Sequence, residues 1–166
     1  AGETLTSVPQ FQAGIHARHT GDAVDVGFVR KGERKTASVV LRGLPFETSD
    51  AFEIVYGDVD VAGSLRRTIV TKPRDGKRHP AIVLIGGIGC YSVDQPFNPG
   101  DAYRSLLDGF TRRGFVTLRV EKSGMGDSTG EACATVDLDT EVSGLVGGLR
   151  QLKQQAFVDP ARVFIF

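Results

Sequence analysis

Residues 80–89 read P-A-I-V-L-I-G-G-I-G, the stretch that predicts the fold of most of the chain. Its first part, 81–85, is an unbroken apolar run ending in glycine, which is typical of a strand buried on both faces of a parallel sheet. Gly86, Gly87 and Gly89 predict a turn with positive φ that brings the backbone close to whatever lies at the strand's carboxyl end. Ligands bind at this end in open α/β sheets, so the glycine turn is the first candidate for a functional site.

Helices and strands alternate after this stretch. Helices are predicted over 101–113 and 139–154, and strands over 115–120 and from Arg162 onward, after a break at Asp159-Pro160. The predicted buried residues are Tyr103, Leu106, Leu107 and Phe110 in the first helix and Leu138, Val142, Leu145, Val146, Leu149 and Leu152 in the second. This alternation predicts right-handed crossovers and a parallel sheet.

The N-terminal part predicts a helix followed by a β-hairpin. Ser7 is expected to cap a short helix, and the alternating runs 23–30 and 35–41 are joined by a tight turn at 31–33. Three segments, G-E-T-L-T-S-V-P-Q-F, T-G-D-A-V-D-V-G-F-V-R-K-G-E-R and T-A-S-V-V-L, resemble the C-terminal part of a PDZ domain. The resemblance implies that a longer parent protein captures a peptide C-terminus. The alternative is an unrelated small antiparallel element after a helix.

The expected division is a PDZ-like part over 1–43, a linker over 44–50 and an α/β part over 51–166. The linker prediction rests on glycine, proline and polar residues without a period. Residues 52–56 and 65–71 are predicted as two strands around a turn at 57–63. The chain stops inside the apolar run 163–166, so we expect an internal fragment of a longer protein; the alternative is a complete protein with a buried C-terminal strand.

Composition excludes some classes of partner. The chain has 166 residues, with Lys+Arg and Asp+Glu both 20, so the formal net charge is zero. Chains that bind nucleic acid or an anionic membrane usually carry an excess of basic residues, and this chain has no such excess. No apolar run approaches the ~20 residues of a membrane-spanning helix.

Two glycine motifs bind nucleotides, and the glycine turn matches neither of them fully. The Walker pattern G-x-x-x-x-G-K-[ST] is missing. A dinucleotide fingerprint lacks its third glycine, because 87–89 is followed by C-Y-S, and the predicted helix starts only at Asp101. Glu121 ends the next strand, as a ribose-binding acid would, but lies further on than the usual ~20 residues. An NAD-type Rossmann-like domain therefore remains the second hypothesis, and a binding or adaptor module without chemistry is the third.

The segment 80–89 together with G-F-V-T-L-R-V-E-K-S-G-M-G-D-S-T-G at 114–130 resembles the N-terminal half of the α/β-hydrolase fold. That family follows its strands with an oxyanion-hole loop and then a loop of the form R-G-x-G-x-S-x-G, matched here by 122–130 with Lys and Ser at the first two positions. The expected fold is a partial α/β hydrolase, a mostly parallel sheet with flanking helices. The nucleophile elbow G-x-S-x-G would begin where this chain stops, at Phe166.

The resemblance implies a serine hydrolase that acts on an ester or amide, with an esterase or peptidase as the parent protein and without a cofactor or metal. It places the oxyanion donors at the backbone of Ile88 and Gly87, while the nucleophile, acid and histidine are expected outside this chain. The substrate would be a small ester or amide, or a peptide. The isolated fragment is expected to be inactive. His16, His19 and His79 are interpreted as surface residues.

Several polar residues lie in the loops after the two central strands. Cys90 and Cys133 could pair, which would pin the oxyanion loop and favour a periplasmic or secreted location, or they are two unrelated buried thiols. Ser128 is expected to bond within its own loop rather than act as a nucleophile. Asp127 and Glu121 are expected to pair with a neighbouring arginine; the alternative is that they bind substrate.

Overall fold

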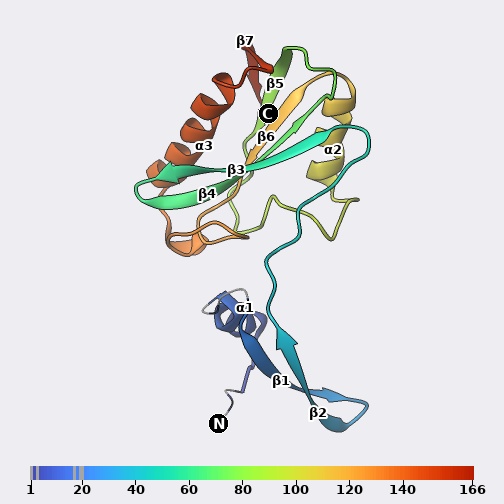
Figure 1. Ribbon diagram of the computed structural model, residues 1–166. Helices are drawn as coiled ribbons and strands as arrows, with labels where there is room; N and C mark the ends of the chain where they lie inside the picture. The colour runs from blue at the N-terminus through green and yellow to red at the C-terminus, as the bar shows by residue number, and fades with distance from the viewer. Residues whose placement is uncertain (1, 3, 17, 19–20) are drawn as a thin grey trace. The chain divides into compact units, whose positions relative to one another are not determined.

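The computed structural model describes residues 2, 4–16, 18 and 21–166. The chain divides into two compact units, Ala1–Gly43 and Leu44–Phe166 (Figure 1), which are described separately. No helix in the described part of the chain combines the length and apolar character needed to cross a membrane.

The first unit consists of a helix and a two-stranded hairpin. Helix α1 (Val8–His16) begins after Ser7, whose Oγ accepts from the N–H of Gln10 at 3.4 Å. Strands β1 (Ala23–Arg30) and β2 (Glu33–Val40) pair antiparallel. The turn residues Lys31 and Gly32 have φ values of 55° and 81°, as a two-residue type I′ hairpin requires. His19 lies outside the described residues.

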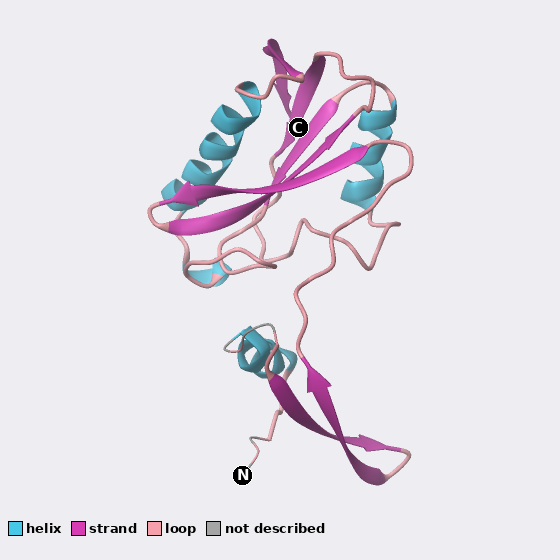
Figure 2. Ribbon diagram, in the orientation of Figure 1, coloured by secondary structure: helices cyan, strands magenta, loops and turns pink. Residues whose placement is uncertain are grey.

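The second unit contains a five-stranded sheet in the order β3-β4-β6-β5-β7 (Figure 2). Its strands are β3 (Glu53–Val61), β4 (Ser64–Lys72), β5 (His79–Leu84), β6 (Val116–Val120) and β7 (Val158–Ile165). Strand β5 lies between β6 and β7 and is parallel to both, while β3 and β4 pair antiparallel and β4 pairs antiparallel with β6. The sheet is therefore mixed, and the prediction that it is mostly parallel is wrong for the pairings made by β3 and β4. The helical crossovers dictate the direction only of β5, β6 and β7.

Two strand boundaries also differ from the sequence prediction. A hairpin turn was expected over 57–63, but it is confined to Ala62 and Gly63, which have φ values of 53° and 83°. Strand β3 continues past Gly57 because Val59 and Val61 extend its alternating pattern. Strand β7 begins at Val158, and Asp159-Pro160 does not end it. The pairing of β5 with β7 shifts register between His79 and Ala81, which leaves room for Pro160 in β7. Strand β7 is at the edge of the sheet, where a missing N–H is tolerated.

Helices α2 (Ala102–Arg112) and α3 (Leu138–Lys153) cover opposite faces of the sheet (Figure 1). The face under α3 is apolar, and its core is formed by Ala81, Val83, Val116, Leu118, Val120, Leu152 and Val158. The face under α2 is partly polar. There, the Thr71 hydroxyl lies 2.5 Å from that of Thr111 and 2.6 Å from that of Thr117. Alternation along β6 therefore separates two chemically different faces.

The buried faces of both helices differ from the predicted apolar stripes. In α2 the buried side chains are Arg104, Leu107, Asp108 and Thr111, whereas Tyr103 and Leu106 are exposed. In α3, Leu138 and Val142 are exposed, and the buried residues include Gly144 and Gly148. Leu152 is buried, and Leu145 and Leu149 pack against the core, as predicted. Arg104 can be buried in α2 because Glu47, distant in the sequence, supplies the opposite charge, and Asp108 lies next to Arg104 on the same helix.

Replacing Gly148 with alanine is expected to destabilise the chain. The added Cβ would lie 2.6 Å from Val120 Cγ2 and 3.3 Å from Leu118 Cδ2, so overpacking should outweigh the gain of about 1 kcal/mol in helix propensity. We expect a net loss of about 1 kcal/mol in urea unfolding. Gly109→Ala in α2, whose added Cβ would meet only the end of Arg113 at 3.5 Å, is the control and should stabilise. Equal effects of the two variants would contradict this account of α3 packing.

Candidate functional site

The glycine loop, residues 86–100, leaves the sheet at the carboxyl end of β5. Because β5 and β6 are parallel, the loop after β6 (residues 121–137) leaves at the same edge. None of Gly86, Gly87 and Gly89 has the positive φ that the sequence predicted. Glycine is favoured instead by a close contact, since a Cβ on Gly86 would lie 3.0 Å from the hydroxyl of Tyr91. Glycine at this turn therefore makes room for an aromatic side chain.

The two predicted backbone donors differ in their partners. The N–H of Gly87 donates to the hydroxyl of Tyr91 at 2.6 Å. Ile88 has a fully exposed side chain, and its N–H has no hydrogen-bond acceptor among the described residues. The N–H of Ile88 is thus free to meet a ligand at this edge of the sheet, whereas that of Gly87 is already engaged.

The loop after β6 is joined to β4 through residues 127–129. Ser128 Oγ accepts from the N–H of Arg67 at 2.9 Å, and Thr129 bonds Leu65 both through its N–H and through its hydroxyl, each at 2.8 Å. The prediction that Ser128 bonds within its own loop holds for its N–H, which donates to the carbonyl of Met125 at 2.9 Å, but not for its hydroxyl. Asp127 pairs with Arg67 at 3.2 Å, as predicted. Both Ser123 and Ser128 are buried, and Ser128 has a structural partner.

Glu121 connects the end of β6 to the glycine loop. Its carboxylate accepts from Ser92 Oγ at 2.5 Å and from the N–H of Val93 at 3.2 Å, and also from the N–H of Lys122 at 3.0 Å. Among the described residues its carboxylate has no arginine partner, so the predicted ion pair is not formed by Glu121. The role of this buried carboxylate is to hold the chain at Ser92 and Val93.

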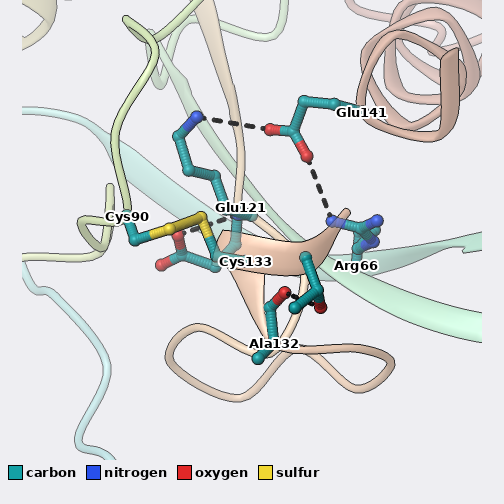
Figure 3. The surroundings of a disulfide bond; sticks show 8 residues. Arg66, Cys90, Glu121, Ala132, Cys133 and Glu141 are labelled. Atoms are coloured by element: carbon teal, nitrogen blue, oxygen red, sulfur yellow. Dashed lines mark hydrogen bonds and ion pairs between the residues drawn. A yellow bond between two sulfur atoms is a disulfide. The ribbon is translucent and has the colours of Figure 1, made fainter. Parts of the chain in front are cut away.

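A disulfide joins the same two loops (Figure 3). Cys90 in the glycine loop is bonded to Cys133, the first residue of a short 3₁₀ helix, with Cα atoms 5.6 Å apart. Of the two alternatives left open by the sequence, the structure contains the bonded pair. The cross-link ties the glycine loop to the loop after β6 at a second point, beside Glu121.

Removing this disulfide is expected to destabilise the chain by about 2–4 kcal/mol, since the bond closes a loop of 43 positions in the unfolded chain. The measurement is urea unfolding of the Cys90→Ser/Cys133→Ser variant. As a control, dithiothreitol should lower the midpoint of the parent chain and leave that of the variant unchanged. Two free thiols in the denatured, unreduced chain would contradict the pairing.

A cavity of about 190 Å³ opens between the β3–β4 turn, the loop after β6 and the start of α3. Its lining includes the buried Arg66 together with Ser123, Asp137 and Thr140. Arg66 pairs with Glu141 at 3.4 Å (Figure 3), so its charge is balanced within the protein. Within the described ranges, no cluster of three or more His, Cys, Asp or Glu side chains is arranged to hold a metal ion.

A buried charge cluster lies under α2 and was missed by the sequence prediction. Arg119 in β6 and Glu47 in the segment 44–50 are both buried and form a two-point ion pair with N···O distances of 2.8 and 2.6 Å. Burial alone would raise the pKa of Glu47, but the hydrogen bonds and charge of Arg119 outweigh it and hold the pKa below its ordinary value. The predicted linker has no helix or strand, yet Glu47 packs inside the second unit. An arginine within a buried strand whose other residues are uncharged was the sequence signal for a buried counter-ion.

Asp94 in the glycine loop is buried next to this cluster. Its carboxylate accepts from the hydroxyl of Tyr56 at 2.8 Å. Burial is the main cause that raises the pKa of Asp94 to about 6, while the hydrogen bond from Tyr56 acts in the opposite direction. Burial likewise raises the pKa of the Tyr56 phenol.

Asp94→Asn is expected to change how stability depends on pH. The folded chain holds the Asp94 proton up to about pH 6, whereas the unfolded chain releases it near the ordinary value of 3.8, so ionisation destabilises the fold as pH rises through this window. The variant, which keeps the acceptor for Tyr56, should match the parent below pH 4 and be more stable above pH 6 by about 1–3 kcal/mol. Urea unfolding from pH 3.5 to 8 measures the difference. Asp159→Asn is the control, because the hydrogen bond from Arg162 lowers the pKa of Asp159. Ionisation of Asp159 therefore stabilises the fold, and this variant should be less stable than the parent above pH 4.

Comparison with known proteins shows which solved structures have a similar fold. No protein-family model and no curated protein sequence matches the chain. Among solved structures, it is similar to the α/β hydrolase GrgF from Penicillium sp. sh18 (17% identity, TM-score 0.55), covering 69% of this chain and 36% of that one. It is similar to the esterase Est22 (16%, TM-score 0.52), covering 70% and 35%, and to a putative dipeptidyl aminopeptidase IV from Bacteroides ovatus (18%, TM-score 0.59), covering 86% and 25%.

The chain thus spans about a third or less of the length of these structures. At such low identity the likeness concerns the fold alone. The chain has an α/β fold with a mixed sheet and flanking helices, a fold that it shares with part of these α/β hydrolases.

Proposed function

We propose that this chain carries the oxyanion loop of a serine hydrolase of the α/β-hydrolase family, which cleaves an ester or amide of a small molecule or peptide. The observation that carries the proposal is the position of Ile88: its unengaged N–H lies in the loop at the carboxyl end of the central parallel strand β5. A fixed N–H at this edge stabilises the negative charge that develops on a carbonyl oxygen under attack. The nucleophile, acid and histidine lie in the rest of the parent protein.

Two further features support the proposal. Strands β7, β5 and β6 are parallel and in the order that places the glycine loop and the loop after β6 at one edge. The similar structures include an esterase and a putative aminopeptidase. By contrast, α2 begins only at Ala102, so no helix N-terminus directly follows the glycine turn to bind a pyrophosphate, which disfavours the dinucleotide hypothesis.

We also propose that the helix and hairpin of the first unit are the end of a PDZ-like domain, whose complete form binds a peptide C-terminus. The Cys90–Cys133 disulfide supports a periplasmic or secreted location, where such bonds persist.

A serine-directed fluorophosphonate probe tests the hydrolase proposal. In the full-length parent, the probe should label one serine beyond Phe166 and abolish hydrolysis of a p-nitrophenyl ester in proportion to labelling. The chain 1–166 should be neither labelled nor active. Labelling of Ser123 or Ser128, or ester hydrolysis by 1–166 alone, would contradict the proposal.

A further inference from the structure

Glu47 precedes the sheet in the chain, yet its carboxylate lies beneath the glycine loop. We propose that Glu47 is a positioning residue, which holds the glycine loop so that the N–H of Ile88 is fixed toward the reacting carbonyl. The inference rests on the proposed function, since it concerns the same oxyanion loop. It adds that the segment joining the two units is part of the support of this site.

The first step of the argument is direct contact. Glu47 Oε1 accepts from the backbone N–H of Gln95 at 2.8 Å, in addition to its bonds from Arg119. Arg119 in turn donates to the carbonyl of Val93 at 2.8 Å. The ion pair therefore binds the loop backbone at both Val93 and Gln95. Each partner is almost completely buried, so water does not compete for these bonds.

Two more side chains extend the contact on both sides of the loop. The Tyr56 hydroxyl accepts from the N–H of Glu47 at 2.8 Å and donates to Asp94 at 2.8 Å. Arg104 from α2 donates to the carbonyl of Gln95 at 2.7 Å and to that of Thr48 at 3.4 Å. Residues 47–48 and 93–95 are thus held to each other by side chains from β3 and α2.

The second step connects this contact to Ile88. Only residues 89–92 separate Ile88 from Val93, and three of them are fixed. Cys90 is held by the disulfide, Tyr91 by the N–H of Gly87, and Ser92 by Glu121. Because this segment is short and its residues are held in place, a displacement of residues 93–95 also displaces the N–H of Ile88. A shift of about 1 Å at a donor is enough to lower a rate by orders of magnitude.

Amide hydrogen exchange on the chain 1–166 tests the positioning role. The informative amides are those of Gly87 and Val93, because their acceptors are Tyr91 and Glu121 rather than Glu47. In Glu47→Gln they should exchange about tenfold faster through local opening, while β6 amides such as Leu118, which open only with the whole fold, report the accompanying change in global stability. Glu53→Gln is the matched control, because Glu53 is a more exposed carboxylate that pairs with Lys72.

A milder variant keeps the test decisive if Glu47→Gln does not fold. Tyr56→Phe keeps the ring and removes only the hydroxyl that bridges Glu47 and Asp94, and it should raise exchange at Val93 in the same direction. The comparison is made in Glu47→Gln or in Tyr56→Phe, whichever folds. The inference would be overturned if Gly87 and Val93 exchanged there as slowly as in the Glu53→Gln control.

Kinetics of the full-length parent separate positioning from stability. Glu47→Gln should lower kcat for a p-nitrophenyl ester about 10–100-fold with KM within threefold of the parent value, since a displaced donor acts on the transition state. An unchanged kcat despite faster loop exchange would overturn the inference. If the unmodified full-length protein hydrolyses no ester or amide, the proposed function fails, and the exchange experiment still decides whether Glu47 holds the loop.

Discussion

Replacing Ile88 with proline is expected to lower kcat of the proposed hydrolase activity in the full-length protein by about 10²–10³-fold, the usual effect of removing one oxyanion donor. Proline has no backbone N–H, so the substitution deletes the one predicted donor that is unengaged among the described residues. The Ile88 side chain is fully exposed, so its loss disturbs no packing. Steady-state kinetics with a p-nitrophenyl ester measure the effect, which should fall mainly on kcat.

Ile88→Ala is the matched comparison, because it changes the same side chain and keeps the N–H. The ratio of kcat between the alanine and proline variants therefore isolates the donor. Proline also restricts the backbone of Gly87, so the fold of each variant is checked by urea unfolding. A ratio near one, with both variants folded, would assign the oxyanion donor to another residue.

Replacing Arg119 with methionine is expected to destabilise the chain by about 3–5 kcal/mol, as measured by urea unfolding at pH 7. The substitution leaves the Glu47 carboxylate buried with Arg104 as its remaining cation, at 3.5 Å. It also removes the donor to the carbonyl of Val93. Breaking a buried ion pair from one side costs this much because the remaining charge stays desolvated.

Arg162→Met is the control for this prediction. Arg162 also pairs with a carboxylate, that of Asp159 at 2.6 Å, but its side chain is 57% exposed. Surface pairs contribute about 0–1 kcal/mol, so the control should change stability by less than about 1 kcal/mol. A similar loss in both variants would show that burial does not govern the strength of the Glu47–Arg119 pair.

Much of the fold follows from local sequence patterns. The apolar run 81–85 predicted the central strand β5, and the short glycine turn of 31–33 predicted the β1–β2 hairpin. Both depend on preferences that act over a few residues, namely burial of consecutive apolar side chains and the positive φ of Lys31 and Gly32. The antiparallel pairing of β4 with β6 could not be predicted in this way, because no local pattern specifies which distant strand becomes the neighbour.

The candidate site shows the same division. The sequence placed the glycine loop and the two predicted donors after β5, but it attributed the glycines to positive φ rather than to the contact with Tyr91. It interpreted the segment that contains Glu47 as a linker. The stripe of α2 that it expected to be buried contains the exposed Tyr103 and Leu106, and the buried stripe contains Arg104.

By itself, then, the sequence determined the strands, the hairpin and the edge of the sheet at which two loops meet, because apolar periodicity and turn chemistry are local. Only the tertiary structure decided which polar side chains are buried. Glu47 and Arg119 are 72 positions apart, and each can leave water only because the other supplies the opposite charge. That condition belongs to the pair and cannot be read from the neighbourhood of either residue.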